Sequence, residues 1–269
     1  MKKSIALLGL ALASLACNAV HADVKPERTR LEGDPPKAVL WVGNSFFYYN
    51  NGMPNMYSEL TKAADMPART TLIGIGGSGI DWHDVDSYLK PGSKIGYYSI
   101  INNKARMNPP GRQYDTMVVM DCSQCPIHPE LSSVFHEYAK IDADTARKYG
   151  VRPVFFMSWA YKDKPEMTAQ LAEAYTREAN ANGALVIPAG LAFARAIKLR
   201  PDLEFYQKDK RHPQRIGSYL GACTAFAALT GKSPVGNSYT ADLDPETAKF
   251  LQTVAWDTVQ EFTGAGGAR

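Results

Sequence analysis

A serine near the start of the chain and a histidine near its end are of the residue types that form a nucleophile and its base. Ser45 follows an apolar run, residues 39–42, and a Gly-Asn pair. Far along the chain, Asp209 precedes His212 by three residues. Histidine is the usual base for a serine hydroxyl, because it titrates near neutral pH without help. A carboxylate in the same turn can fix the imidazole tautomer, so the pattern is typical of acyl transfer.

The apolar run before Ser45 predicts a buried strand of a parallel sheet. A short continuous apolar segment that ends at glycine is typical of a strand covered on both faces. Ligands of open α/β sheets bind beyond the carboxyl ends of the strands, and this is where Ser45 falls. An ordinary serine in a strand-to-helix turn would show the same local pattern. The downstream pair of Asp209 and His212 is what favours the chemical interpretation.

The rest of the chain alternates between predicted strands and helices. Further strands are expected over residues 70–75, 116–120, 151–157 and 184–187. Helices are expected over residues 53–64, 130–149 and 165–179. Three more helices are expected: one that follows the last strand and ends at Leu199, one that begins at Pro213 and one that begins at Pro245. Such alternation implies a parallel sheet with right-handed crossovers. We expect a three-layer α/β/α sandwich with a five-stranded parallel sheet of flavodoxin-like type. Residues 90–112 are expected to be irregular.

Glycines after the second predicted strand offer a backbone donor to an oxyanion. Gly76, Gly77 and Gly79 fall within four residues, and glycine lets the backbone approach a ligand closely. A backbone N–H at a strand end can stabilise the oxyanion of a tetrahedral intermediate. A phosphate-binding loop is the competing interpretation. It is disfavoured because neither the Lys-Ser/Thr of a P-loop nor a G-x-G-x-x-G spacing is present.

Four stretches of the sequence resemble the SGNH/GDSL hydrolase superfamily, in the branch whose nucleophile lies in a Gly-Asn-Ser-Phe block. They read VGNSFFYYNNG, IGIGGSGIDWH, YDTMVVMDCSQ and DKRHPQRIGSYLGACTAFAALTGKSPVG, in the family's order. The resemblance spans residues 38–236 and implies Ser45 as nucleophile, with Asp209 and His212 as its partners and no cofactor. The Gly-x-Ser-x-Gly elbow of ordinary α/β-hydrolases is absent.

The same resemblance implies an oxyanion hole, with one departure from the family pattern. The backbone N–H groups of Ser45 and Gly77 are the expected donors, and Gly79 is the second choice for the glycine. The family's third donor is the Asn of a Gly-x-Asn-Asp block, which is missing after the third strand. Gln124 carries the same amide on a longer stem and is the candidate, with Ser123 as a shorter alternative.

We expect an exported serine esterase that acts on a small-molecule or polysaccharide ester. Carbohydrate O-acetyl esters are common targets of exported members of the family, which makes polysaccharide deacetylation the substrate expectation. One alternative is a catalytically silent or acyl-transferring carbohydrate-binding protein of the same fold, against which the intact Ser45, Asp209 and His212 count. Another is a thiol–disulfide protein using Cys122 and Cys125, which lie after the third strand rather than the first.

Other residues could bind a ligand, although a structural role explains most of them. Asp81 and His83 are two residues apart, which suits neither one helical face nor a known metal-ligand cluster, so no metal site is expected. Trp82 between them fits a sugar-facing wall as well as a cap on the core. The aromatic residues 46–49 could line an acyl or sugar pocket, but packing is favoured for the two Phe.

Cys122 and Cys125 are expected to form a disulfide, because they are the close pair among four cysteines and exported proteins meet oxidising conditions. The closed loop is very short, so its chain-entropy stabilisation should be small. The bridge would instead fix the intervening Ser123 and Gln124. The alternative is two buried free thiols beside a structural glutamine. Cys223 falls within an apolar helical stripe and is expected to be an inert core residue.

Residues 1–22 predict a signal peptide, and residues 23–269 a single SGNH hydrolase-like domain. Two lysines precede an apolar run over residues 5–15, and Val-His-Ala at 20–22 fits a small-residue cleavage site. The run is too short for a bilayer core, which takes ~20 residues. Lipidation of Cys17 is a weaker alternative, because Ser occupies a position where a lipobox prefers Leu. Either way, a periplasmic or secreted protein is expected.

The charge balance indicates neither a nucleic-acid partner nor an anionic membrane surface. The chain has 30 basic and 27 acidic residues. Removal of residues 1–22 deletes two lysines and no acid, which leaves 28 and 27, a net charge of about +1. The remaining 269 − 22 = 247 residues suit one sizeable α/β domain.

Overall fold

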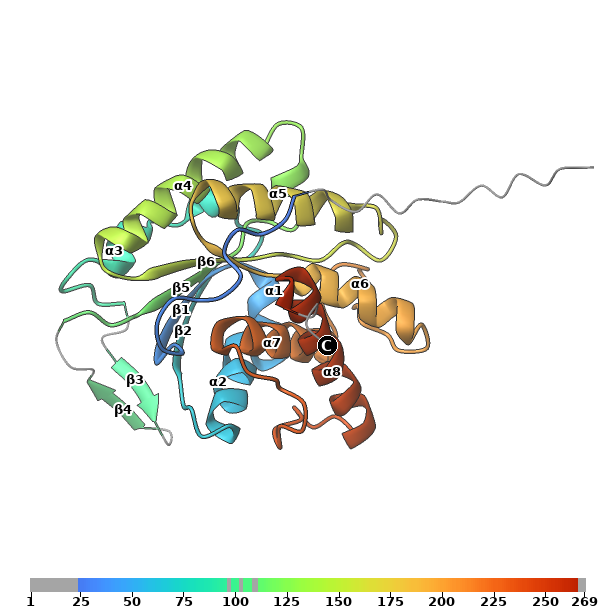
Figure 1. Ribbon diagram of the computed structural model, residues 1–269. Helices are drawn as coiled ribbons and strands as arrows, with labels where there is room; N and C mark the ends of the chain where they lie inside the picture. The colour runs from blue at the N-terminus through green and yellow to red at the C-terminus, as the bar shows by residue number, and fades with distance from the viewer. Residues whose placement is uncertain (1–23, 96–97, 102–103, 108–110, 266–269) are drawn as a thin grey trace, which may run out of the picture.

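The computed structural model describes residues 24–95, 98–101, 104–107 and 111–265. One central sheet lies between two groups of helices (Figure 1). The predicted signal peptide and the alternative lipidation at Cys17 lie outside the described residues. Of the helices within those ranges, none combines the length and the apolar character needed to cross a membrane.

Five parallel strands make the central sheet, in the order β2-β1-β5-β6-β7. Their bounds are β1 Ala38–Gly43, β2 Arg69–Gly74, β5 Thr116–Val119, β6 Arg152–Phe156 and β7 Leu185–Ile187. Counted along the chain within this sheet, the order is 2-1-3-4-5, which is flavodoxin-like. The predicted fold class is therefore confirmed. The strand order reverses around β1, and a doubly wound sheet forms its ligand crevice at that switch point.

Helices cover both faces of the sheet, as Figure 1 shows. On one face lie α3 (Val85–Leu89), α4 (Ser132–Lys148) and α5 (Met167–Ala181). On the other lie α2 (Met53–Ala63), α7 (Arg215–Thr230) and α8 (Pro245–Phe262), and α6 (Ala189–Leu199) packs against α7 and α8. Each predicted helix is found within a few residues of its expected bounds.

The helix α7 is the most deeply buried helix of its layer. Every residue from Gly217 to Leu229 is buried, so its apolar surface runs all round rather than along one stripe. Small residues allow this packing: a Cβ on Gly221 would lie 2.6 Å from Met53 Cε. Cys223 is a free and fully buried thiol, and burial raises its pKa, so the predicted inert core role is confirmed.

The start of α7 differs from the prediction that Pro213 opens the helix. Pro213 forms a short antiparallel bridge with Tyr206, and the next residue, Gln214, donates its N–H to the Phe205 carbonyl at 2.8 Å. These contacts keep the backbone extended past Pro213, and the helix begins at Arg215.

Residues 90–112 contain regular structure, so the expectation of an irregular segment was wrong. Strands β3 (Tyr98–Ile101) and β4 (Lys104–Met107) pair as an antiparallel hairpin. The hairpin is a separate two-stranded sheet. It does not join the central sheet, so it does not need the continuous apolar run that revealed the other strands.

Two buried carboxyl groups lie close to the end of β5. Asp121 follows that strand and Asp142 is on α4, and each has one carboxylate oxygen without a hydrogen-bond partner among the described residues. Burial raises the pKa of Asp121 to about 6, against the opposing effect of two backbone N–H bonds. Burial, followed by the charge of Asp121, raises the pKa of Asp142 to about 8.

We expect Asp142→Asn to stabilise the fold in alkali and to change it little in acid. The folded protein retains the Asp142 proton while the unfolded chain has lost it, so the free energy of unfolding falls as pH rises from about 4 to about 8. The amide side chain of Asn does not titrate in this pH range, so the variant lacks this loss of stability. Thermal unfolding should therefore show a larger gain in Tm at about pH 8.5 than at about pH 4.5.

The exposed Asp34 provides the control for this experiment. Asp34→Asn should change Tm at about pH 8.5 much less than Asp142→Asn does, because Asp34 is on the surface. A gain for Asp142→Asn that is equal at both pH values would contradict the assignment, because a simple packing effect does not depend on pH.

Candidate active site

Ser45, His212 and Asp209 form one hydrogen-bonded row. Ser45 Oγ lies 2.8 Å from His212 Nε2, and His212 Nδ1 lies 2.5 Å from Asp209 Oδ2. A carboxylate can only accept, so Nδ1 carries the proton and Nε2 is left to accept from the serine hydroxyl. The fold thus brings together the three residues that were singled out from the two ends of the sequence. In this order the imidazole can take a proton from Ser45.

Ser45 is the first residue of α1 (Ser45–Tyr48), directly after β1, and Asn44 joins the two. The Asn44 Oδ1 atom caps the helix by accepting the Phe46 N–H at 3.2 Å. Its Nδ2 donates to the carbonyls of Ser78 at 3.2 Å and Asp121 at 3.1 Å. One buried amide therefore connects the loops that follow β1, β2 and β5. The sequence suggested nothing about these two tertiary contacts.

The turn that carries Asp209 and His212 is fixed from within. Asp209 Oδ1 accepts the N–H groups of Arg211 and His212, both at 3.0 Å. Burial opposes ionisation, but these bonds and the imidazole bond outweigh it and hold the Asp209 pKa below its usual range. The carboxylate is therefore ionised at neutral pH. Trp159 also holds the turn, because its Nε1–H donates to the Arg211 carbonyl at 3.0 Å.

Aromatic rings fix the plane of the His212 imidazole. The Tyr49 ring stacks on it, with centroids 4.2 Å apart and an interplanar angle of 12°. Phe46 presents its edge at 5.5 Å and stacks in turn on Trp159. Phe46 and Phe47 are both buried, which confirms packing as the role of the two Phe. The stacking of Tyr49 was missed, because adjacency to Ser45 in the sequence does not reveal which aromatic ring faces His212.

A second residue that sequence reasoning missed is Asn50. Its Nδ2 donates to the Pro213 carbonyl at 2.9 Å and to Ser218 Oγ at 2.8 Å. Its own backbone is left-handed, with φ of 56°, a conformation that asparagine tolerates better than most residues. The loop after Ser45 is thereby fastened to the loop after His212. The turn-rich Asn-Asn-Gly at 50–52 was the available signal.

The glycine turn after β2 lies against the end of β1. The Ile75 N–H donates to the Gly43 carbonyl at 3.0 Å, which continues the pairing of the two strands into the turn. Gly77 has φ of 73°, in the region that favours glycine, and a Cβ placed there would meet no atom within 4 Å. The space beside Gly77 is therefore open.

His83 takes part in a buried hydrogen-bond network with Ser78 and Tyr88. Its Nε2 lies 3.1 Å from Ser78 Oγ, and its Nδ1 lies 3.5 Å from the Tyr88 hydroxyl. Burial lowers the His83 pKa, with the Gly43 carbonyl and Asp81 acting in the opposite direction. The neutral imidazole of His83 therefore supports the glycine turn through its contact with Ser78.

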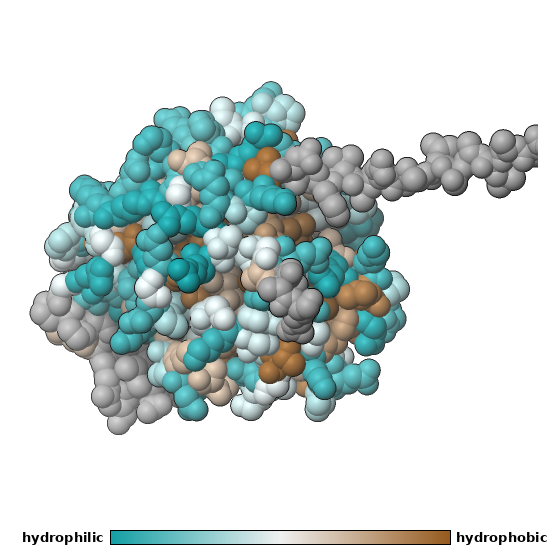
Figure 2. All heavy atoms as spheres, viewed as in Figure 1, coloured by the Kyte–Doolittle hydropathy of each residue, from teal (hydrophilic) through white to brown (hydrophobic). Residues whose placement is uncertain are grey.

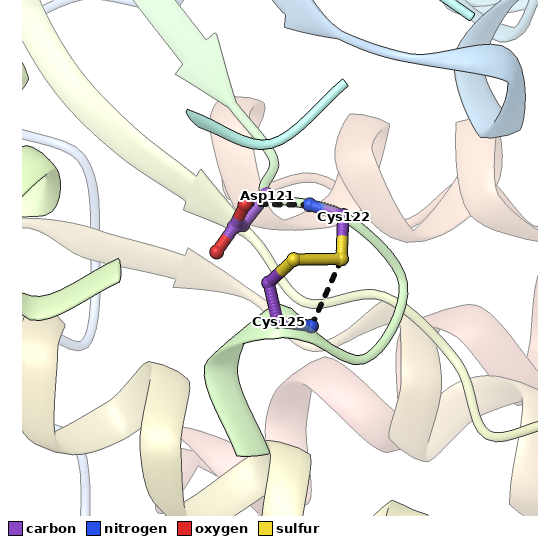
Figure 3. Close-up of side chains that lie close together, drawn as sticks. All are labelled: Asp121, Cys122 and Cys125. Atoms are coloured by element: carbon purple, nitrogen blue, oxygen red, sulfur yellow. Dashed lines mark hydrogen bonds between the residues drawn. A yellow bond between two sulfur atoms is a disulfide. The ribbon is translucent and has the colours of Figure 1, made fainter. Parts of the chain in front are cut away.

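The loop after β5 carries the Cys122–Cys125 disulfide, as predicted (Figure 3). Asp121 fixes the start of this loop, because its Oδ1 accepts the N–H groups of Ile80 at 2.8 Å and Cys122 at 2.7 Å. Side-chain donor atoms of Asp121, Cys122 and Cys125 lie within 4.8 Å of one another. The sulfurs are bonded to each other, so they offer no thiolates to a metal ion.

Between the two cysteines, Ser123 and Gln124 differ in their surroundings. Ser123 Oγ lies 2.7 Å from the Tyr161 hydroxyl, and the Arg211 guanidinium lies over the Tyr161 ring at 4.6 Å. Ser123 is thus engaged beside the histidine turn. Gln124 is half-buried at the start of the short helix η3 (Cys125–Ile127). Oxyanion donation by Ser45, Gly77 and Gln124 stays a prediction.

Solved structures of SGNH hydrolases share this fold. A DUF4886 family protein from Bacteroides uniformis matches with a TM-score of 0.58 and 22% identity, over 82% of this chain and 94% of that one. A protein provisionally described as an SGNH hydrolase, from Slackia heliotrinireducens, matches with a TM-score of 0.53 and 21% identity, over 71% and 98%. A catalytic mutant of Axe2, an acetylxylan esterase from Geobacillus stearothermophilus, matches with a TM-score of 0.53 and 12% identity, over 76% and 98%.

The likeness in structure confirms the resemblance noted in the sequence as one of fold. No protein-family model matches the chain, and no curated protein matches it significantly. What the site does chemically therefore has to be argued from its own geometry.

We expect Tyr49→Leu to slow the reaction of Ser45 with a fluorophosphonate probe, and Tyr49→Phe to leave it nearly unchanged. An aromatic pair is worth about 0.5–1.5 kcal/mol, which corresponds to a loss of roughly 2- to 10-fold when the imidazole is no longer held in plane. Phe keeps the stacked ring and so serves as the matched control. Equal labelling rates for the Leu and Phe variants would show that the stack has no such role.

Proposed function

We propose that the protein is an exported serine esterase that hydrolyses a carbohydrate O-acetyl ester through an acyl-enzyme. The observation that carries the proposal is the hydrogen-bonded row of Ser45, His212 and Asp209 at the switch point of the sheet. The fold shared with SGNH hydrolases, among them an acetylxylan esterase, supports an ester as substrate. Export is inferred from residues 1–22, and the disulfide suits an oxidising compartment.

In this proposal His212 acts first as base and then as acid. Its Nε2 takes the proton of Ser45 Oγ as that oxygen attacks the ester carbonyl, and the ionised Asp209 stabilises the imidazolium. The imidazolium then protonates the departing sugar oxygen, which leaves an acetyl group on Ser45. A water molecule, deprotonated by His212, then attacks this acyl-enzyme. Acetate leaves as the imidazolium returns the proton to Ser45 Oγ, which restores the free enzyme.

The developing negative charge on the carbonyl oxygen needs donors at fixed positions. The proposed donors are the backbone N–H groups of Ser45 and Gly77 and the side-chain amide of Gln124. Preorganised donors stabilise the transition state because they need no reorientation when the charge appears. The contacts of Asn44 and Asp121, which hold the glycine turn and the disulfide loop to the nucleophile's loop, would supply that rigidity.

Acyl transfer to an acceptor alcohol instead of water remains the second candidate, because the same acyl-enzyme serves both outcomes. The hydrogen bond between Ser45 and His212 favours either reaction over a protein that only binds carbohydrate. Acetate release from an acetylated polysaccharide, measured with and without an added alcohol acceptor, separates hydrolysis from transfer.

Ser45→Ala and His212→Ala should each lower turnover of p-nitrophenyl acetate by a similar factor, roughly 10³ or more, because the two residues act as one unit. Asp209→Asn should cost less. A fluorophosphonate probe should label the unaltered protein and fail to label Ser45→Ala. Equal labelling of the two proteins would refute Ser45 as the nucleophile.

The disulfide and Gln124 should affect rate much more than stability. Gln124→Ala is expected to lower turnover on the order of 10²-fold, as for other single oxyanion donors. Gln124→Glu has nearly the same shape but no amide donor, so it should be similarly slow. Reduction of the disulfide should lower the rate while Tm barely moves, because the closed loop is very short.

The control for reduction is the double variant Cys122→Ser with Cys125→Ser, which should not respond to reductant. An unchanged rate for Gln124→Ala would leave Ser123 or the backbone alone as the third donor. A large fall in Tm on reduction would mean that the bridge stabilises the fold as a whole.

A further inference from the structure

We propose that a sugar-binding shelf lies beside Ser45, formed by Tyr48, Trp82 and the exposed backbone of Gly76 and Gly77 between them. The shelf would hold the neighbouring sugar of a neutral polysaccharide chain while the acetylated sugar lies at Ser45. The inference rests on the proposed function and adds to it a subsite for the polymer.

The aromatic residues of the shelf are unusually open to solvent. Trp82 is 60% exposed and Tyr48 is 41% exposed, whereas Trp41 and Trp159 are fully buried. Leaving an indole in water forgoes the free energy that burial of its apolar surface would provide. A single exposed apolar side chain needs no explanation, but Ile75, at the start of the same turn, is also 37% exposed. Three such residues around one turn indicate a ligand surface.

The turn between the two aromatic residues exposes its backbone at Gly76 and Gly77, whereas Ser78 and Gly79 are buried. A Cβ on Gly76 would lie 2.9 Å from the Tyr48 hydroxyl, and one on Gly74 would lie 3.0 Å from Tyr48 Cδ1, so the Tyr48 ring lies across this end of the turn. At the other end, the Trp82 N–H donates to the Gly79 carbonyl at 3.3 Å. A Cβ at Gly77, between them, would meet no atom within 4 Å.

The shelf is fixed to the nucleophile through the backbone. Tyr48 follows Ser45 by three residues on α1, which places it one helical turn away. The Ser78 carbonyl, within the turn, accepts a hydrogen bond from Asn44, the residue before Ser45. A ligand resting on this turn is therefore held in a constant position relative to the reacting serine.

The chemistry of the shelf suits a sugar better than an acyl chain. Sugar rings have apolar C–H faces that pack on aromatic rings, and their hydroxyls can bond to exposed backbone groups such as those of a glycine turn. A long acyl chain instead gains most from an enclosed apolar pocket. Asp81 is the charged side chain of the segment 75–82, and its negative charge disfavours anionic polysaccharides.

The first test measures binding without turnover. Ser45→Ala protein is titrated with partially acetylated xylo-, manno- and gluco-oligosaccharides, with calorimetry and tryptophan fluorescence as readouts. Adding Trp82→Ala should weaken binding of the best ligand by roughly 10-fold or more, and Trp82→Phe should retain most of the affinity. Leu199→Ala, which removes an exposed apolar side chain at the end of α6, is the matched control and should bind normally.

The second test uses turnover in protein with Ser45 intact. Trp82→Ala should raise KM for the acetylated oligosaccharide by roughly 10-fold and leave kcat/KM for p-nitrophenyl acetate unchanged, because the small ester does not reach the shelf. A merely structural effect of the substitution would lower the rate on both substrates.

Four results would overturn the shelf. The first two are failure of all three oligosaccharides to bind and binding that is unaffected by Trp82→Ala. The third is a loss of activity in Trp82→Ala on p-nitrophenyl octanoate alone, which would make the surface a binding site for acyl chains. The fourth is a change from dimer to monomer in light scattering of Trp82→Ala, which would make the surface a contact between two copies. If the unaltered protein hydrolyses no ester but binding still depends on Trp82, the esterase proposal fails and the shelf stands.

Discussion

The arrangement of the site depends on the buried side-chain amide of Asn44. A polar group taken out of water costs free energy unless it is hydrogen-bonded, so a buried amide has a strong preference for the one geometry that satisfies it. Here its oxygen caps α1, and its nitrogen donates to the carbonyls of Ser78 and Asp121. Any independent movement of the three loops would leave at least one of these groups unpaired. The loop of Ser45, the glycine turn and the disulfide loop are therefore held together as one unit.

Asp121 adds a second connection at the same place, at a cost in stability. Its carboxylate bonds the backbone N–H groups of Ile80 and Cys122, yet burial still raises its pKa to about 6. Ionisation of Asp121 at neutral pH is thus less favourable than that of a carboxyl group in water. Burial and the charge of Asp121 raise the pKa of Asp142 further, to about 8. Keeping these two buried carboxyl groups ionised therefore costs free energy at neutral pH. Asp121 thus fixes the loops around Ser45 in one geometry at some cost in stability.

Local sequence patterns were sufficient to predict the strands of the central sheet, because a continuous apolar run directly indicates a strand that is buried on both faces. The row of Ser45, Asp209 and His212 could also be anticipated, since a strand end and an Asp-x-x-His turn are each visible in a few residues. The stacking of Tyr49 on His212 and the hydrogen bonds of Asn50 could not be anticipated from the sequence. They join segments more than 160 residues apart, and no local pattern specifies which loops meet. The extended backbone at Pro213 has the same origin, in its pairing with Tyr206.

Rigid loops also constrain how the site can recognise a substrate. The turn of His212 is held by Trp159 and by its own Asp209, and the neighbouring loop after β5 is closed by a disulfide. Loops held in this way are poorly suited to closing over a ligand, so selectivity has to come from surface that exists before binding. The His212 side chain is 23% exposed, which leaves the row accessible from solvent. An accessible, preformed edge can admit one residue of a long polymer whose neighbours extend along the surface, which an enclosed pocket could not do.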